Sequence, residues 1–296
     1  MKRKTAVICL VLFGILLSSC TSTKTTEGKQ NVSKGAYIEN KGSDTLVNLA
    51  LAWAEEYHKE NPDVQISVTG GGSGTGFTAL INGTITIANA SRQIKSEEIE
   101  TAKANGFEPI EFIVANDAIA VIVNPENPIS RLTLEQVSKI YKGEYTNWLD
   151  VGGEDRPIVK LSRETNSGTH VYFLETVVRL GSKEDKNIFS ADTLLLPSSE
   201  GIISEVRDNP NAIGYDGLGY VTSDVKMVAL AIESGGDFIL PSVETVISGD
   251  YPISRHLYMY TRGEPVGVEL DYLNWIQSSD AQSTITELGF VPYVRE

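Results

Sequence analysis

Hydrophobic and polar positions alternate along this chain with two different periods, and together they predict an α/β protein. Val64, Ile66 and Val68 are separated by polar residues, which is the period of a strand with one buried face. The run at 118–123 is continuously apolar and predicts a buried strand. Further short strands are expected at 158–161 and 212–215. Short strands that alternate with helical stretches are typical of a sheet flanked by helices.

Helical spacing is clear in two segments. Near the start of the folded part, apolar residues recur every three or four positions at Leu46, Leu49, Trp53 and Tyr57. The pair Asn61-Pro62 predicts the end of that helix. Near the end of the chain, the same spacing occurs at Leu270, Leu273 and Ile276. The chain therefore carries helices at both ends, and it shows no internal repeat.

The first residues predict export from the cytoplasm. Three basic residues at 2–4 precede an apolar run at 6–17, and small residues follow, so we expect a signal peptide at 1–19. The run is shorter than the ~20 residues that a membrane span requires. Cys20 directly follows Leu-Ser-Ser and resembles the acylated cysteine of bacterial lipoproteins, although it could be one more small residue at a cleavage site. The expected location is the outer face of the cytoplasmic membrane, held by lipid on Cys20, or the periplasm.

Composition narrows the classes further. Residues 20–35 are mostly polar and predict a flexible tether, which leaves a folded part long enough for two domains. The cysteines are Cys9 and Cys20, and Cys9 lies in the expected signal peptide. The exported chain would then have one cysteine, which can form neither an internal disulfide nor a thiolate metal cluster. The formal net charge of −14 argues against nucleic acid as a partner.

Three turns rich in glycine and hydroxyl residues precede predicted helices, at 42–45, 70–76 and 166–169. A helix start exposes unpaired N–H groups and about half a positive charge, so each turn could hold an anion, or its Ser, Thr or Asp could be an ordinary N-cap. Arg163 lies four residues before Ser167, and Arg92 follows Ser91. A guanidinium can bind a tetrahedral oxyanion with two parallel hydrogen bonds or form a surface ion pair. Turns and arginines together favour an oxyanion site.

These motifs give the chain a specific resemblance. It resembles the phosphate-binding proteins of bacterial phosphate ABC transporters, which have the type II periplasmic-binding-protein fold. The likeness covers nearly all of the chain after residue 36. It is carried by GSDTL at 42–46, GGGSGTG at 70–76, DAIAVIVNPENP at 117–128, IYKGEYTNWLDVGG at 140–153, RETNSGT at 163–169 and NPNAIGYDGLGYV at 209–221.

The resemblance implies an architecture. We expect two α/β lobes, each a mixed sheet flanked by helices, with the ligand in the cleft between them. Chain crossings near 116–118 and 255–258 give a first lobe of 36–116 plus 259–296 and a second lobe of 117–258. It also implies a monomer without cofactor or bound metal, which delivers inorganic phosphate to ABC permease subunits with their ATPase.

The resemblance further implies a set of phosphate-binding residues at the three turns and beside the two arginines. They are Ser43, Asp44, Thr45, Ser73, Ser91, Arg92, Arg163, Ser167, Gly168 and Thr169. Tyr141, Asn147, Trp148 and the segment around Tyr215 are given structural roles.

The chain departs from the best-known branch of the family at the residue that distinguishes phosphate from sulfate. That branch has an aspartate beside the ligand, which accepts the proton of hydrogen phosphate, whereas this chain reads Ala90-Ser91-Arg92. We hypothesise that Asp44 supplies the acceptor and that Arg92 pairs with it and adds a grip on the ligand. Asp44 could instead cap its helix. A second departure is Thr165, where an aspartate often steadies the arginine, and Glu164 could serve in its place.

Other classes have less support. Sulfate, molybdate or tungstate could replace phosphate, and a sensor or adhesin could use the same pocket. A hydrolase or phosphatase needs a nucleophile, a base and a group that orients the base. His58 and His256 have no obvious partner, and we expect His170 to lie on the surface. We therefore expect a binding protein that catalyses no reaction.

Overall fold

The computed structural model describes residues 35–293, so the predicted signal peptide, Cys20 and all of the tether except Gly35 lie outside the described residues. Within this range, nine strands join in one mixed sheet. Across the sheet the order is β2 (Val64–Thr69), β1 (Ala36–Gly42), β3 (Ile87–Ala90), β11 (Ser254–Arg262), β4 (Pro109–Val123), β8 (Ala212–Gly217), β6 (Val159–Arg163) and β7 (Leu194–Leu196), with β9 (Lys226–Met227) also paired to β4. A separate pair is formed by β5 (Arg131–Thr133) and β10 (Ala229–Ala231).

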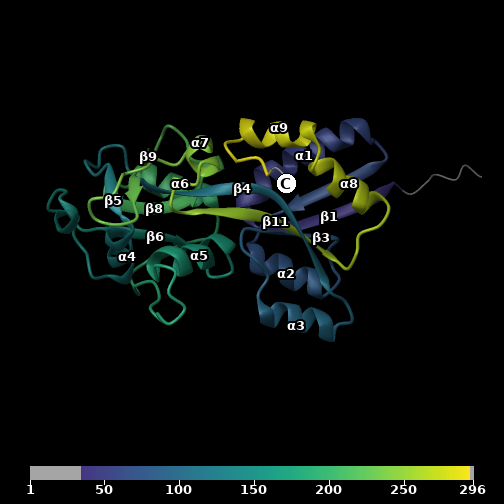
Figure 1. The fold of residues 1–296 in the computed structure, drawn as a ribbon, viewed down its shortest axis with the longest axis horizontal. Helices are drawn as coiled ribbons and strands as arrows, with labels where there is room; N and C mark the ends of the chain where they lie inside the picture. The colour runs from purple at the N-terminus through teal and green to yellow at the C-terminus, as the bar shows by residue number, and fades with distance from the viewer. Residues whose placement is uncertain (1–34, 294–296) are drawn as a thin grey trace, which may run out of the picture. The chain divides into compact units, whose positions relative to one another are not determined.

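Strands β4 and β11 connect the two halves of the sheet, and they lie side by side in the middle of Figure 1. β4 is antiparallel to β11 up to Ala118 and then pairs with β8 from Ile119 onward. The pairing of β11 shifts register between Leu257 and Tyr258, where its pairing with β3 begins. These changes of partner fall beside the expected crossings at 116–118 and 255–258. The division of the chain into two moving lobes stays a prediction.

Helices cover both faces of the sheet. In the half that contains β1, helices α1, α8 and α9 lie on one face, and α2 and α3 lie on the other (Figure 1). In the second half, α6 packs against β8 and β6, while α4 and α5 pack against the turn η3. The bounds are α1 (Val47–Glu60), α2 (Ser73–Ile81), α3 (Ser96–Ala104), α4 (Leu134–Lys142), α5 (Gly168–Phe173), η3 (Leu174–Val178), α6 (Ser199–Asp208), α7 (Val243–Ile247), α8 (Val268–Ile276) and α9 (Ser279–Glu287). The predicted α/β class is confirmed.

The hydrophobic pattern accounts for these elements. The predicted strands correspond to β2, the second part of β4, β6 and β8, and residues 118–123 are buried. Helix α1 ends at Glu60, directly before Asn61, as predicted. Trp53 of α1 is fully buried, and its indole N–H donates to the carbonyl of Ala281 at 2.8 Å, which fixes α1 against α9. Among residues 35–293, no helix combines the length and apolar character needed to cross a bilayer.

Candidate functional site

The three glycine- and hydroxyl-rich turns open helices and lie close together. The first leads into the short 3-10 turn η1 (Asp44–Leu46), the second opens α2 at Ser73, and the third opens α5 at Gly168. The second and third turns contact each other directly, because the amide of Gly74 donates to the carbonyl of Asn166 at 3.0 Å. The side-chain amide of Asn166 donates in turn to the carbonyl of Gly71 at 2.9 Å. The amide of Gly71 also donates to Asp44 Oδ1 of the first turn at 2.9 Å, so the three turns are gathered in one region, where anions can bind at helix starts.

Three buried serine hydroxyls from these turns and from the end of β3 form a cluster. Ser43 Oγ donates to Ser91 Oγ at 2.9 Å, and Ser73 Oγ lies 3.3 Å from Ser91 Oγ. The amide of Ser91 also donates to Ser73 Oγ at 3.0 Å. The structure thus brings together predicted site residues that are up to 48 positions apart in the sequence.

Gly168 brings the backbone of α5 against this serine cluster. A Cβ atom added to Gly168 would lie 2.4 Å from Ser73 Oγ and 2.6 Å from Ser91 Oγ, so only glycine fits here without a shift of its neighbours. Ser167 precedes Gly168 as the N-cap of α5, and its Oγ accepts from the amide of Thr169 at 3.2 Å. The ordinary capping interpretation therefore describes Ser167 in this structure.

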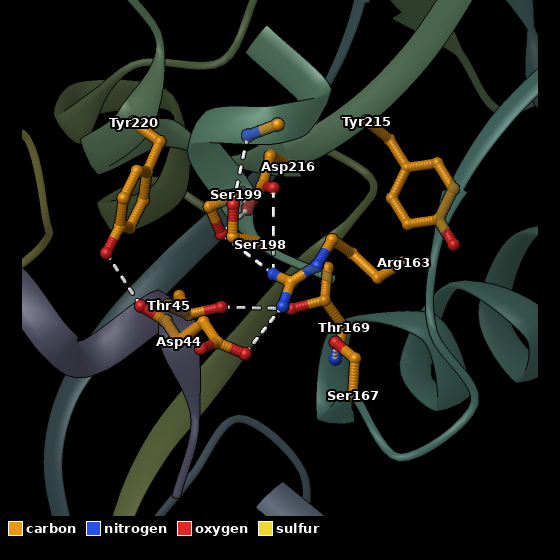
Figure 2. Close-up of polar contacts among 12 residues, drawn as sticks. Asp44, Thr45, Arg163, Ser167, Thr169, Ser198, Ser199, Tyr215, Asp216 and Tyr220 are labelled. Carbon is orange, nitrogen blue, oxygen red and sulfur yellow. Dashed lines mark hydrogen bonds and ion pairs between the residues drawn. The ribbon is translucent and has the colours of Figure 1, made fainter. Parts of the chain in front are cut away.

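Arg163 ends β6 at the centre of the site and is almost fully buried (Figure 2). Its Nη2 donates to Asp44 Oδ2 at 2.5 Å and to the carbonyl of Pro197 at 2.9 Å. Its Nη1 donates to Ser199 Oγ at 2.8 Å and lies 3.9 Å from Asp216 Oδ2. The guanidinium is thus held in one orientation by groups on both of its sides.

Asp216 is the buried carboxylate on the far side of Arg163 from Asp44 (Figure 2). Its Oδ1 accepts from Ser199 Oγ at 3.0 Å and from the amide of Gly217 at 2.8 Å. Burial raises the pKa of Asp216 to about 6, although the charge of Arg163 acts in the opposite direction. Nothing in the sequence pattern assigned Asp216 to the site, because it follows the strand predicted at 212–215 and is a strand residue only in the structure.

Asp44 and Arg92 do not form the pair that the sequence suggested. Asp44 binds Arg163, and its Oδ1 accepts from the amide of Gly71 at 2.9 Å, so it links two turns. The N-cap residue of η1 is Ser43 and not Asp44. Arg92 forms two hydrogen bonds with Glu98, at 2.8 and 2.7 Å, and lies over the ring of Phe77. The expected pairing of Arg92 with Asp44 was therefore wrong, because a closer carboxylate on α3 neutralises Arg92.

The carboxylates that hold Arg163 also differ from expectation. The sequence offered Glu164 as a substitute for the aspartate that Thr165 replaces. Within the part of the chain that the structure describes, Arg163 forms ion pairs with Asp44 and Asp216 and not with Glu164. Both partners are distant in the sequence, so local spacing could not identify them.

His170 is buried, and its expected surface position was wrong. Its Nδ1 lies 2.8 Å from the carbonyl of Arg163 and 3.0 Å from Ser162 Oγ, and burial lowers its pKa. Ser162 Oγ is also 2.6 Å from the hydroxyl of Tyr215, so the histidine belongs to a packed polar network beneath the site. Among residues 35–293, the structure holds no group of three or more His, Cys, Asp or Glu side chains arranged for a metal ion.

Tyr141 and Trp148, which were given structural roles, are buried in the core of the second half. Tyr215 stacks on Phe173 with ring centroids 3.6 Å apart. Asn147 caps the turn η2 (Trp148–Val151) and accepts from the amide of Leu149 at 2.9 Å. These contacts hold β6 and α5 in place and so position Arg163 and Gly168.

Comparison with known proteins agrees with this architecture. The family model described as a PBP superfamily domain matches residues 22–280. Phosphate-binding proteins PstS from Pseudomonas aeruginosa and from Bacillus subtilis are each 31% identical to the chain, over 99% of this chain and 95% of the relative. A solved structure from Clostridium perfringens, described as a phosphate ABC transporter substrate-binding protein with bound phosphate, is 31% identical. It has a TM-score of 0.77 and covers 87% of this chain and 100% of its own.

Two of these findings decide the family. The matched domain model covers most of the chain, and the curated relatives align with it from end to end. The solved structure shares the arrangement of the sheet and helices over the described residues. The chain belongs to the PBP superfamily and, within it, to the family of the phosphate-binding proteins PstS.

Proposed function

We propose that this protein is the phosphate-binding component of an ABC phosphate transporter and catalyses no reaction. The observation that carries the proposal is the buried guanidinium of Arg163 beside three gathered helix starts. Helix-start amides, hydroxyls and one guanidinium are the donors that a desolvated tetrahedral oxyanion needs. The names of the curated relatives, and the phosphate in the structure from Clostridium perfringens, support phosphate as that oxyanion.

The proposed ligand-binding residues are those at the three turns and at the end of β3. Ser43, Thr45, Ser73, Ser91, Ser167 and Thr169 offer hydroxyls, Gly168 offers its amide, Arg163 offers its charge, and Asp44 offers an acceptor. Arg92 was expected to be a second cation of the site, but its guanidinium pairs with Glu98, so we give it no direct grip on the ligand.

Asp44 is the residue that we propose to distinguish phosphate from sulfate. A carboxylate beside the bound anion can accept a hydrogen bond from the proton of hydrogen phosphate, whereas sulfate has no proton to donate near neutral pH. Its neighbour Arg163, 2.5 Å away, offsets the cost of holding two negative groups together. Each oxygen of Asp44 accepts one hydrogen bond, from Gly71 or from Arg163, and has a second lone pair with which it can accept from the ligand.

Capture is proposed to occur by closure of two lobes, 36–116 with 259–296 and 117–258. The contact of Gly74 with Asn166, and the 3.0 Å contact of Thr45 Oγ1 with Thr169 Oγ1, would join the lobes around the ligand. The closed form would then be recognised by the permease subunits, whose ATPase supplies the energy. Lipid on Cys20 would hold the monomeric protein at the outer face of the membrane.

The test is a calorimetric titration of the mature chain, residues 20–296, with phosphate, arsenate, sulfate and molybdate between pH 7 and 8. We expect binding of phosphate and arsenate and at least tenfold weaker binding of sulfate, the margin that a single unpaired buried acceptor can produce. Heat with another oxyanion and none with phosphate would overturn the proposal.

A further inference from the structure

A second buried arginine, Arg255, contacts the candidate site from β11, although neither the sequence motifs nor the resemblance assigned it a role. Its Nη2 lies 3.3 Å from Thr45 Oγ1 and 3.0 Å from Thr169 Oγ1. Thr45 belongs to the start of η1 and Thr169 to the start of α5, so one guanidinium nitrogen touches hydroxyls from both halves of the sheet. These two hydroxyls also lie 3.0 Å from each other.

Hydrogen counting shows what this arrangement does to the two threonines. A guanidinium can only donate, so the threonine oxygens accept from Arg255, and the two hydrogens of Nη2 are shared among Thr45 Oγ1, Thr169 Oγ1 and Asp117 Oδ2. The contact between the two oxygens uses the hydrogen of one hydroxyl. The hydrogen of the other hydroxyl is then free to point at an acceptor, and an oxyanion offers only acceptors. With both oxygens accepting from Arg255, one of the two hydroxyl hydrogens is therefore left to donate to an anion.

Arg255 is itself fixed by contacts on all sides. Asp117 Oδ2 accepts from Nη2 at 2.9 Å, and the carbonyl of Ser91 accepts from Nη1 at 2.9 Å. The ring of Tyr172, on α5, lies 5.5 Å from the guanidinium carbon. Asp117 also accepts from the amide of Leu218 at 3.1 Å, so the ion pair joins β4, β11 and the end of β8. A group that is held this firmly can orient its neighbours.

We propose that Arg255, held by Asp117, is a positioning residue for phosphate binding that acts through the hydroxyls of Thr45 and Thr169. This inference rests on the proposed function. The inference also links lobe closure to the state of the site, because Arg255 contacts Thr45 and Thr169 together only when η1 and α5 are close. Lysine has a single nitrogen on a flexible stem, so Arg255→Lys keeps the charge and cannot reproduce all of these contacts.

The test is a double-mutant cycle in phosphate affinity, with Arg255→Lys, Thr169→Val and the combined variant of the mature chain. We expect each single change to weaken phosphate binding about tenfold, since each disturbs hydrogen bonds of charged groups. The combined variant should bind phosphate at most about twofold more weakly than the single variant with the lower affinity, because both changes remove the same arrangement. Arg262→Lys makes the same change at an exposed position of β11 and should bind phosphate like the parent.

Each outcome has a distinct meaning. Unchanged affinity in Arg255→Lys, or losses that multiply to about a hundredfold in the combined variant, would overturn the positioning role while the proposed function stands. If the parent binds no phosphate, the proposed function itself fails. If circular dichroism shows that Arg255→Lys is unfolded, the combination of Arg255→Gln with Asp117→Asn replaces the ion pair by a neutral pair. Phosphate affinity must then fall in that variant, or the inference is wrong.

Discussion

Asp216 allows a quantitative prediction, because its carboxyl is fully buried beside Arg163 and its pKa is raised from 3.8 to about 6. A pKa that is raised in the folded state means that the native protein binds the proton more tightly than the unfolded chain. The stabilising effect of this proton is complete below about pH 4 and is lost as the pH rises through 6. The shift corresponds to roughly 3 kcal/mol of unfolding free energy, at about 1.4 kcal/mol for each pH unit.

The perturbation is Asp216→Asn, which keeps the shape of the side chain and removes its titration. We expect this variant to gain stability relative to the parent as the pH rises from 4 to 7, by roughly 3 kcal/mol over that interval. The measurement is urea unfolding of both proteins at several pH values in phosphate-free buffer, because a ligand that binds the native state would add its own stabilisation. Asp224→Asn makes the same change at an exposed aspartate and serves as the control.

The decisive quantity is the pH dependence of the difference, not its size at one pH. Asparagine also changes the hydrogen bonds with Ser199 and Gly217, and that effect is the same at every pH. A difference between parent and Asp216→Asn that stays constant from pH 4 to 7 would refute the reasoning. A difference that changes with the opposite sign would mean that Arg163 outweighs burial and that Asp216 stays ionised.

Three further changes test the site and the core. Asp44→Asn removes the proposed proton acceptor, so the ratio of phosphate to sulfate affinity in calorimetry should fall about tenfold, and an unchanged ratio would contradict the acceptor role. Gly168→Ala places a methyl group 2.4 Å from Ser73 Oγ and should weaken phosphate binding at least about tenfold, whereas Gly201→Ala, with 3.4 Å of space in the first turn of α6, should bind normally. Trp53→Ala should cost about 3 to 5 kcal/mol in urea unfolding, and a loss below about 1 kcal/mol would mean that the α1–α9 contact contributes little.

The sequence predicted the parts of the fold that depend on local pattern. Strand and helix periods placed the main elements, and the glycine- and hydroxyl-rich turns predicted the helix starts at Ser73 and Gly168. Arg163 could be found for the same reason, since it lies four residues before one of these turns. Each of these signals is contained within a few neighbouring residues.

The partners of the arginines could not be predicted in this way, because sheet pairing brings them together across long stretches of chain. Asp117 meets Arg255 only through the antiparallel register of β4 and β11, where the two residues face each other. His170 was placed wrongly because no partner was evident in the sequence, whereas the fold brings the carbonyl of Arg163 and Ser162 Oγ to its Nδ1. The pairing of Arg92 with Glu98 could have been predicted from the local sequence, because Glu98 lies six residues later.

The charged groups gathered at the site set the conditions under which so acidic a chain can bind an anion. Two buried guanidiniums, Arg163 and Arg255, face three carboxylates, Asp44, Asp117 and Asp216, so the group carries one negative charge when all five are ionised. An incoming anion adds negative charge and disfavours the ionised form of a carboxylate close to it. Burial already raises the pKa of Asp216 to about 6, and its protonation would leave the group without net charge. Hydrogen phosphate can offset part of the remaining repulsion by donating a hydrogen bond, whereas sulfate has no proton to donate near neutral pH. The proposed discrimination against sulfate would therefore rest on the hydrogen bond to Asp44, within a group that carries no excess positive charge.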